Sequence, residues 1–101
     1  MNNHFDEQKW ATLSFYAQMG NIGSEVGRTM NAIRRNDKAA LTGAYYRGLD
    51  LIDATAKNTL SFTRRRELLR ARELFSTAVE NNTVDQKLDD YFMTFAVLAR
   101  S

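Results

Sequence analysis

The chain contains no proline, and only five of its 101 residues are glycine. β-Sandwiches and barrels need these two residue types at their many turns, whereas long helices do not. Apolar residues recur at steps of three and four along most of the chain, which is the spacing of one face of an α-helix. We therefore predict an all-α fold for residues 1–101, a single domain built as an up-down-up-down four-helix bundle with a long first helix.

The longest periodic segment predicts a first helix over about residues 6–35. Gly20, Gly23 and Gly27 lie along one flank of it, where the missing side chains let another backbone approach closely. Close packing at this flank would offset the low helix propensity of glycine, and the alternative is a break or bend near Gly20 and Asn21. A helix of this length spans about 45 Å, against about 30 Å for the other helices. We expect the projecting end to pair with a second copy through the glycine flank, giving a homodimer.

Further helices are predicted over about residues 38–58 and 63–80, and a last helix follows Thr83. Asp37 is a good N-cap for the second helix, and Thr83 with Gln86 forms a T-x-x-Q capping box for the last one. The segments between the helices are short, so neighbouring helices are expected to pack antiparallel. Aromatic residues at helical spacing are expected in the core and not around a ligand pocket; they are Tyr45, Tyr46, Tyr91, Phe92 and Phe95.

The middle of the chain is strongly basic, although the formal net charge of the whole is only +2. Residues 28–72 carry a charge of +7, whereas the segments before and after them carry −2 and −3. The stretch "RRRELLRARE", residues 64–73, places five arginines in ten residues, mostly on the solvent-facing side of the predicted third helix. Pairs three residues apart, Arg64 with Glu67 and Arg70 with Glu67 or Glu73, would neutralise two of these arginines.

The arginines near the predicted turns are candidate contacts for phosphates or for acidic partners, because a guanidinium suits both. They are Arg34, Arg35, Arg64, Arg65, Arg66 and Arg70. In the predicted bundle, residues 34–35 lie at the opposite end from residues 64–66, so the arginines form two patches and not one groove. This separation favours a solvated or partner-facing surface over a nucleic-acid site.

Several classes of protein are disfavoured. The chain has no cysteine, which removes disulfides and thiolate chemistry and is typical of a reducing cytoplasm. It has no apolar run of about 18 residues and no basic-then-apolar start, so we expect a cytoplasmic protein with no membrane partner. The stretch "GNIGSEVG" lacks the spacing of a phosphate-binding loop, so no cofactor is expected. His4 is expected to be an exposed side chain near the N-terminus and not a ligand.

An acidic cluster is the one catalytic alternative. Asp50 and Asp53 lie one helical turn apart and would need Asp85, Asp89 or Asp90 to form a magnesium site, in the manner of all-helical nucleotide pyrophosphohydrolases. Those enzymes carry denser E-x-x-E signatures, which are absent from this chain. We therefore expect a solvated acidic face, with no catalytic residue and no metal site.

Two segments, "RRRELLRARELF" and "DDYFMTFAVLARS", together resemble small uncharacterised helical proteins of bacteria. The predicted number of helices is similar to that of HEPN-like and S23-like four-helix bundles. Ribonucleases of the HEPN kind carry an arginine and a histidine near the end of the last helix, whereas the C-terminal "LARS" of this chain contains no histidine. The resemblance therefore implies a bacterial, non-catalytic helical bundle.

These observations lead us to expect a non-enzymatic helical interaction protein that acts as a homo-oligomer or as a partner-binding module. The alternative from another class is a nucleic-acid-associated accessory protein that binds phosphates through the arginines of the third helix. The third hypothesis is the magnesium hydrolase with Asp50, Asp53 and Asp89 in its acidic cluster.

Overall fold

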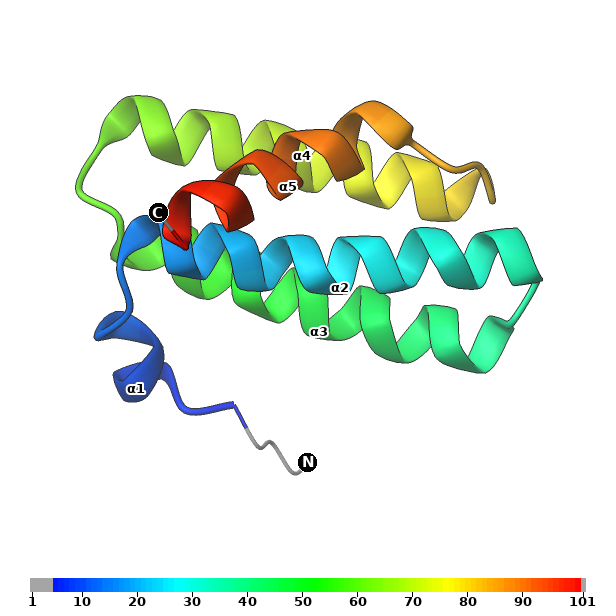
Figure 1. Ribbon diagram of the computed structural model, residues 1–101, viewed down its shortest axis with the longest axis horizontal. Coiled ribbons are helices and arrows are strands. Elements are labelled where there is room, and N and C mark those ends of the chain that lie inside the picture. The colour runs from blue at the N-terminus through cyan, green and yellow to red at the C-terminus, as the bar shows by residue number, and fades with distance from the viewer. Residues whose placement is uncertain (1–4, 101) are drawn as a thin grey trace.

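The computed structural model describes residues 5–100, in which five helices and no strands are formed. The helices are α1 (Glu7–Ala11), α2 (Phe15–Arg35), α3 (Lys38–Asn58), α4 (Phe62–Glu80) and α5 (Gln86–Ala99), as Figure 1 shows. The prediction of an all-α fold is confirmed. The radius of gyration, 13.0 Å, is the value expected of a folded chain of about 100 residues.

The prediction of a long first helix is wrong, because the chain leaves the helical path at residues 12–14. The Asp6 carboxylate caps the short α1, and the Ser14 hydroxyl accepts a hydrogen bond from the backbone N–H of Ala17 and begins α2. The side-chain amide of Gln18 donates to the Trp10 carbonyl oxygen at 2.9 Å and holds the corner between the two helices. Ser14, a residue type that favours the N-cap position, lies within the apolar stripe and is the feature of the sequence that indicates the start of a new helix here.

The alternative break near Gly20 and Asn21 does not occur either, because α2 is continuous through both residues. With 21 residues, α2 is as long as α3. No end of it projects, so the difference in length that motivated a homodimer is absent from the structure.

α2 is the central helix, since it packs against α3 on one side and against α5 on another. α4 packs mainly on α3 and makes few contacts with α5, although α5 follows it in the chain. The predicted up-down-up-down four-helix bundle is therefore not confirmed. The core draws fully buried side chains from four helices: Met19, Ile22, Val26, Met30, Ile52, Leu68, Phe75 and Phe92.

The glycine flank of α2 is the surface on which α5 packs. The Gly20 backbone faces Ala96, Gly23 faces Phe92, and Gly27 faces Asp89. A Cβ atom on Gly23 would lie only 2.8 Å from the Phe92 Cβ. The expected close approach of another backbone is thus present within the chain, and α5 fills the position that a second copy was expected to take.

The connections between the helices lie at two opposite ends of the domain (Figure 1). The α2–α3 and α4–α5 connections share one end, and the α3–α4 connection lies at the other. Asp37, Ser61 and Asp85 cap the helices that follow, each through a side-chain oxygen that accepts a backbone N–H. The cap of the last helix is therefore Asp85 and not Thr83, whose hydroxyl donates to the Asn81 carbonyl oxygen instead.

Candidate functional site

A groove of about 440 Å³ lies between α4 and α5, where the two helices diverge onto different neighbours. Its volume is within the range of about 300–1,000 Å³ that is usual for ligand sites. Ala71 and Leu74 of α4 face Leu88 and Tyr91 of α5 across it, so its walls are mainly apolar. The groove is lined by Glu67, Arg70, Ala71, Leu74, Asp85, Lys87, Leu88 and Tyr91.

A second hollow of about 330 Å³ continues this groove toward the α4–α5 connection. The two share Leu74, Asp85 and Lys87, and together they follow α4 from Glu67 to Asn81. We call this combined surface the α4–α5 groove. Leu74 stands at its middle and is 38 % exposed, so an apolar side chain is open to solvent there.

The two carboxylates of the groove are held by groups of the domain itself. The Tyr91 hydroxyl donates to Glu67 Oε1 at 3.2 Å, and the Asp85 carboxylate accepts the backbone N–H of Leu88 at 3.0 Å as the cap of α5. Burial first, and then the negative charge of Glu67, raise the pKa of Tyr91 to about 12. The phenol therefore stays neutral and fixes the position of Glu67.

The two cations of the groove are free. Arg70 projects from α4 and Lys87 from α5, both are exposed, and neither has a hydrogen-bond or ion-pair partner within residues 5–100. The expected pairing of Arg70 with Glu67 or Glu73 is not formed. The groove thus combines apolar walls with two unpaired positive charges on its opposite sides.

The arginines of residues 64–66 are used within the chain. The Arg64 guanidinium lies over the Phe15 ring, 4.3 Å from its centroid, and Arg66 lies over the Phe62 ring at 5.8 Å. Arg65 donates to the carbonyl oxygens of Ala56 at 3.1 Å and Thr59 at 2.7 Å, which ties the start of α4 to the end of α3. Arg64 does not form the expected ion pair with Glu67 in the described part of the chain, residues 5–100.

The other two candidate arginines lie at the opposite end of the domain, as predicted. Arg34 donates to Asn31 Oδ1 at 2.8 Å and to Gln86 Oε1 at 2.7 Å, so it joins α2 to the start of α5. Arg35 lies 3.6 Å from the carboxylate of Asp37. The six candidate arginines therefore form no continuous basic track, because the two ends are separated by the length of the helices.

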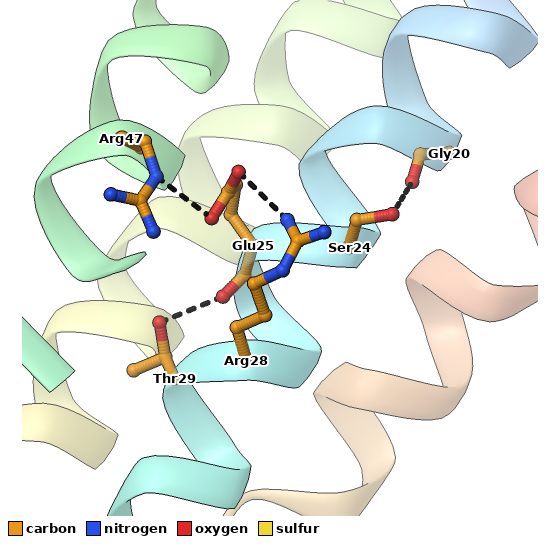
Figure 2. Close-up of polar contacts among 6 residues, drawn as sticks. All are labelled: Gly20, Ser24, Glu25, Arg28, Thr29 and Arg47. Atoms are coloured by element: carbon orange, nitrogen blue, oxygen red, sulfur yellow. Dashed lines mark hydrogen bonds and ion pairs between the residues drawn. The ribbon is translucent and has the colours of Figure 1, made fainter. Parts of the chain in front are cut away.

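The most highly connected charged cluster lies on α2 and α3 and was not anticipated from the sequence. Figure 2 shows Glu25 between two arginines, with Arg28 at 3.0 Å and Arg47 at 3.2 Å. The Glu25 side chain is only 13 % exposed, whereas the side chains of Arg28 and Arg47 are 61 % and 59 % exposed. This cluster joins two helices that already pack closely, so it stabilises the α2–α3 pair.

The structure does not assemble the acidic cluster of the hydrolase hypothesis. Asp53 is paired with Arg72 of α4 through two contacts of 2.7 and 3.1 Å, and this pairing raises the pKa of Arg72. Asp50 lies on α3, and Asp89 packs against Gly27 of α2 instead. No group of three or more acidic, histidine or cysteine side chains in residues 5–100 is arranged to hold a metal ion. His4 lies outside the described residues.

Most of the aromatic residues pack as expected. Phe92 is fully buried and Tyr45 contacts Phe75 at 5.0 Å between ring centroids. The expectation is wrong for Tyr46, which is 60 % exposed, and for Tyr91, which lines the α4–α5 groove. Within residues 5–100, no helix has the length and apolar character needed to cross a membrane. Comparison with family models, curated proteins and solved structures finds no match for this chain.

Proposed function

We propose that this protein is a non-enzymatic interaction module that binds an amphipathic helix of another protein in the α4–α5 groove. The observation that carries the proposal is the pair of unpartnered cations, Arg70 and Lys87, on either side of an apolar channel. A partner helix with an apolar face and acidic flanks satisfies both features, in the way that amphipathic helices occupy grooves on other helical proteins.

The dimensions of the groove support a helical occupant. Its lining follows the last 14 residues of α4, from Glu67 to Glu80, and the adjoining Asn81, which corresponds to about 21 Å of helix. A partner segment of about four turns is long enough to contact the whole groove. An apolar residue of that segment would pack on Leu74, and its acidic residues would approach Arg70 and Lys87.

The groove favours a protein partner over a nucleic acid. A nucleic-acid surface would need contiguous basic residues, and the candidate arginines are divided between two ends and largely engaged within the chain. Binding to another protein is also favoured over homodimerisation through the glycine flank, because α5 occupies that flank.

The proposal is tested with two synthetic helical peptides of about 14 residues that carry the same leucine stripe. One peptide has glutamates flanking the stripe, and the other has lysines in their place. We expect the acidic peptide to bind at least about tenfold more tightly, because charge complementarity selects the partner. Fluorescence anisotropy of labelled peptides gives both affinities.

Three variants locate the binding site. Leu74→Asp should abolish binding of the acidic peptide, and the double variant Arg70→Glu with Lys87→Glu should prefer the basic one. Arg66→Glu is the matched control, because Arg66 is one turn before Arg70 on α4 but does not line the groove. Equal affinity of the unaltered protein for both peptides, or loss of binding in the Arg66 control alone, would contradict the proposal.

A further inference from the structure

The end of the domain at the α3–α4 connection exposes several apolar side chains to solvent. Leu60 is completely exposed and Phe62 is 70 % exposed, both in or beside this connection. Leu13 before α2, Tyr16 in its first turn and Leu98 near the end of α5 are each about 40 % exposed. Figure 1 shows that the start of α2, the α3–α4 connection and the end of α5 lie at this same end.

Contacts between side chains confirm that these segments are close to one another. Phe15 of α2 lies 6.0 Å from Phe95 of α5 between ring centroids, and Arg64 of α4 lies over the same Phe15 ring. Tyr16 is 5.9 Å from Phe95. The segments that carry the exposed apolar residues therefore meet at this end of the domain (Figure 1).

This surface is also basic. Residues 64–66 are three exposed arginines that follow Phe62 almost directly. Arg65 is bonded to carbonyl oxygens at the end of α3, whereas the guanidinium groups of Arg64 and Arg66 cover aromatic rings and have no hydrogen-bond acceptor within residues 5–100. Three segments at this end of the domain, residues 12–24, 54–66 and 91–100, contain no aspartate or glutamate. The short α1 lies at the same end (Figure 1) and adds Asp6 and Glu7 against Lys9. The carboxylates beside these segments are engaged within the chain: Asp6 caps α1, Glu7 lies 3.4 Å from Lys57, and Glu67 accepts from Tyr91.

An anionic lipid surface fits this combination better than other partners. A second copy placed symmetrically on this end would bring six arginines together with no carboxylate among the three segments to balance them. A nucleic acid would satisfy the arginines but would leave the aliphatic Leu60 side chain in water. At a bilayer, apolar side chains enter the boundary between headgroups and acyl chains while guanidinium groups remain at the phosphates.

We propose that the α3–α4 end docks on anionic membranes, with Leu60 and Phe62 inserted into the interface and Arg64 and Arg66 at the lipid phosphates. Docking of this kind needs no spanning helix. The expectation of no membrane partner was based on the absence of a spanning segment and of a basic-then-apolar start, and docking on the surface of a bilayer is a proposal that departs from it.

Co-sedimentation with two kinds of vesicle tests the proposal: phosphatidylcholine alone, and phosphatidylcholine mixed with phosphatidylglycerol. We expect binding to the mixed vesicles only, and a loss of binding as salt is raised. The double variant Leu60→Asp with Phe62→Asp should lower the partition coefficient by at least about tenfold. Arg64→Gln with Arg66→Gln should lower it by about fivefold for each arginine removed. Arg65 is left in place because it caps α3.

Two controls keep the result interpretable. Tyr46→Asp changes an aromatic residue that is 60 % exposed on α3 away from this end, and it should bind vesicles as the unaltered protein does. Leu74→Asp in the α4–α5 groove should also leave vesicle binding unchanged, so the two proposals fail separately. Fluorescence of the single tryptophan, the buried Trp10, reports whether each variant is folded.

Three outcomes would overturn the proposal. They are absence of binding to the mixed vesicles, equal binding to vesicles of phosphatidylcholine alone, and binding that the Leu60 and Phe62 double variant retains. The proposal would also be overturned if the protein bound a single-stranded oligonucleotide and not the vesicles, and if the same substitutions abolished that binding. The ligand of this surface would then be a nucleic acid and not a lipid.

Discussion

Replacing Gly23 by alanine should destabilise the protein, although alanine is the better helix former. The new Cβ atom would lie 2.8 Å from the Phe92 Cβ, which is closer than real Cβ contacts come. Phe92 is fully buried, and the contact involves its Cβ and backbone, so no flexible side-chain end can move away. Separating α5 from α2 to make room costs about 1–3 kcal/mol, whereas helix propensity returns at most about 1 kcal/mol. With the full return from helix propensity, we expect a net loss of up to about 2 kcal/mol in the free energy of unfolding.

The other two glycines of the flank provide graded controls. An alanine Cβ at position 20 would lie 3.1 Å from the Ala96 Cα, and at position 27 it would lie 3.5 Å from Asp89 Oδ1, an ordinary contact. The expected order of stability is therefore Gly27→Ala above Gly20→Ala above Gly23→Ala. Gly27→Ala should equal or exceed the unaltered protein, by up to about 1 kcal/mol.

Thermal and urea unfolding followed by circular dichroism measure these differences. For a domain of this size, 1 kcal/mol corresponds to a change in Tm of about 4–8 °C. If Gly23→Ala stabilises the protein as much as Gly27→Ala does, then α5 does not pack on α2 as closely as the structure shows, and the reasoning is refuted.

Three further predictions concern buried polar groups. Trp10→Phe removes the donor that bonds to the hydroxyl of the fully buried Thr55 at 2.9 Å, and should cost about 1–3 kcal/mol in urea unfolding; full stability of this variant would contradict the role of the bond. The folded-state pKa of Tyr91, about 12, lies above the ordinary value of 10.0, so its contribution to stability is present below pH 10.0 and is lost as the pH rises toward 12. Tyr91→Phe should remove a phenol that titrates near pH 12 from a near-ultraviolet absorbance titration, and it should flatten the fall in stability at high pH. An unchanged titration would contradict the assignment. Burial raises the pKa of Asp89, whose Oδ1 is buried and has no hydrogen-bond partner within residues 5–100, so its ionised form is unfavourable. The stability that the protonated Asp89 carboxyl contributes to the folded state is lost as the pH rises through its raised pKa. Asp89→Asn should therefore be more stable than the unaltered protein near neutral pH, and this difference should shrink as the pH falls toward 3.8. A difference in stability that stays constant across this range would contradict the prediction.

The helical class and three of the four predicted helix positions follow from local pattern, because apolar spacing and the absence of proline act on each segment separately. The interruption between α1 and α2 was missed, since the apolar period continues across Ser14 and only its capping hydroxyl marks the start of a new helix. Local pattern also identified the glycine flank of α2. It did not identify the neighbour, because the choice between α5 and a second copy depends on packing across the whole chain.

The partners of the charged residues were the least predictable part of the candidate site. Spacing along a helix suggests pairs three residues apart, and Arg28 with Glu25 is such a pair. Arg72 instead reaches Asp53 on a neighbouring helix, and Arg64 covers an aromatic ring. The sequence identifies Arg70 as a candidate contact. That its side chain has no ion-pair or hydrogen-bond partner within residues 5–100 depends on how α4 and α5 separate, and no residue pattern along the chain predicts that separation.

The packing of α5 on α2 also bears on the order in which the protein folds during synthesis. α2 and α3 are adjacent in sequence and can pair as soon as both have left the ribosome. The glycine flank of α2 stays open to other hydrophobic surfaces while α3 and α4 are made, because its neighbour α5 is translated after them. The nascent chain therefore carries an exposed, closely approachable helix face until α5 emerges, and a chain interrupted before α5 would retain that face as a site for aggregation or chaperone binding.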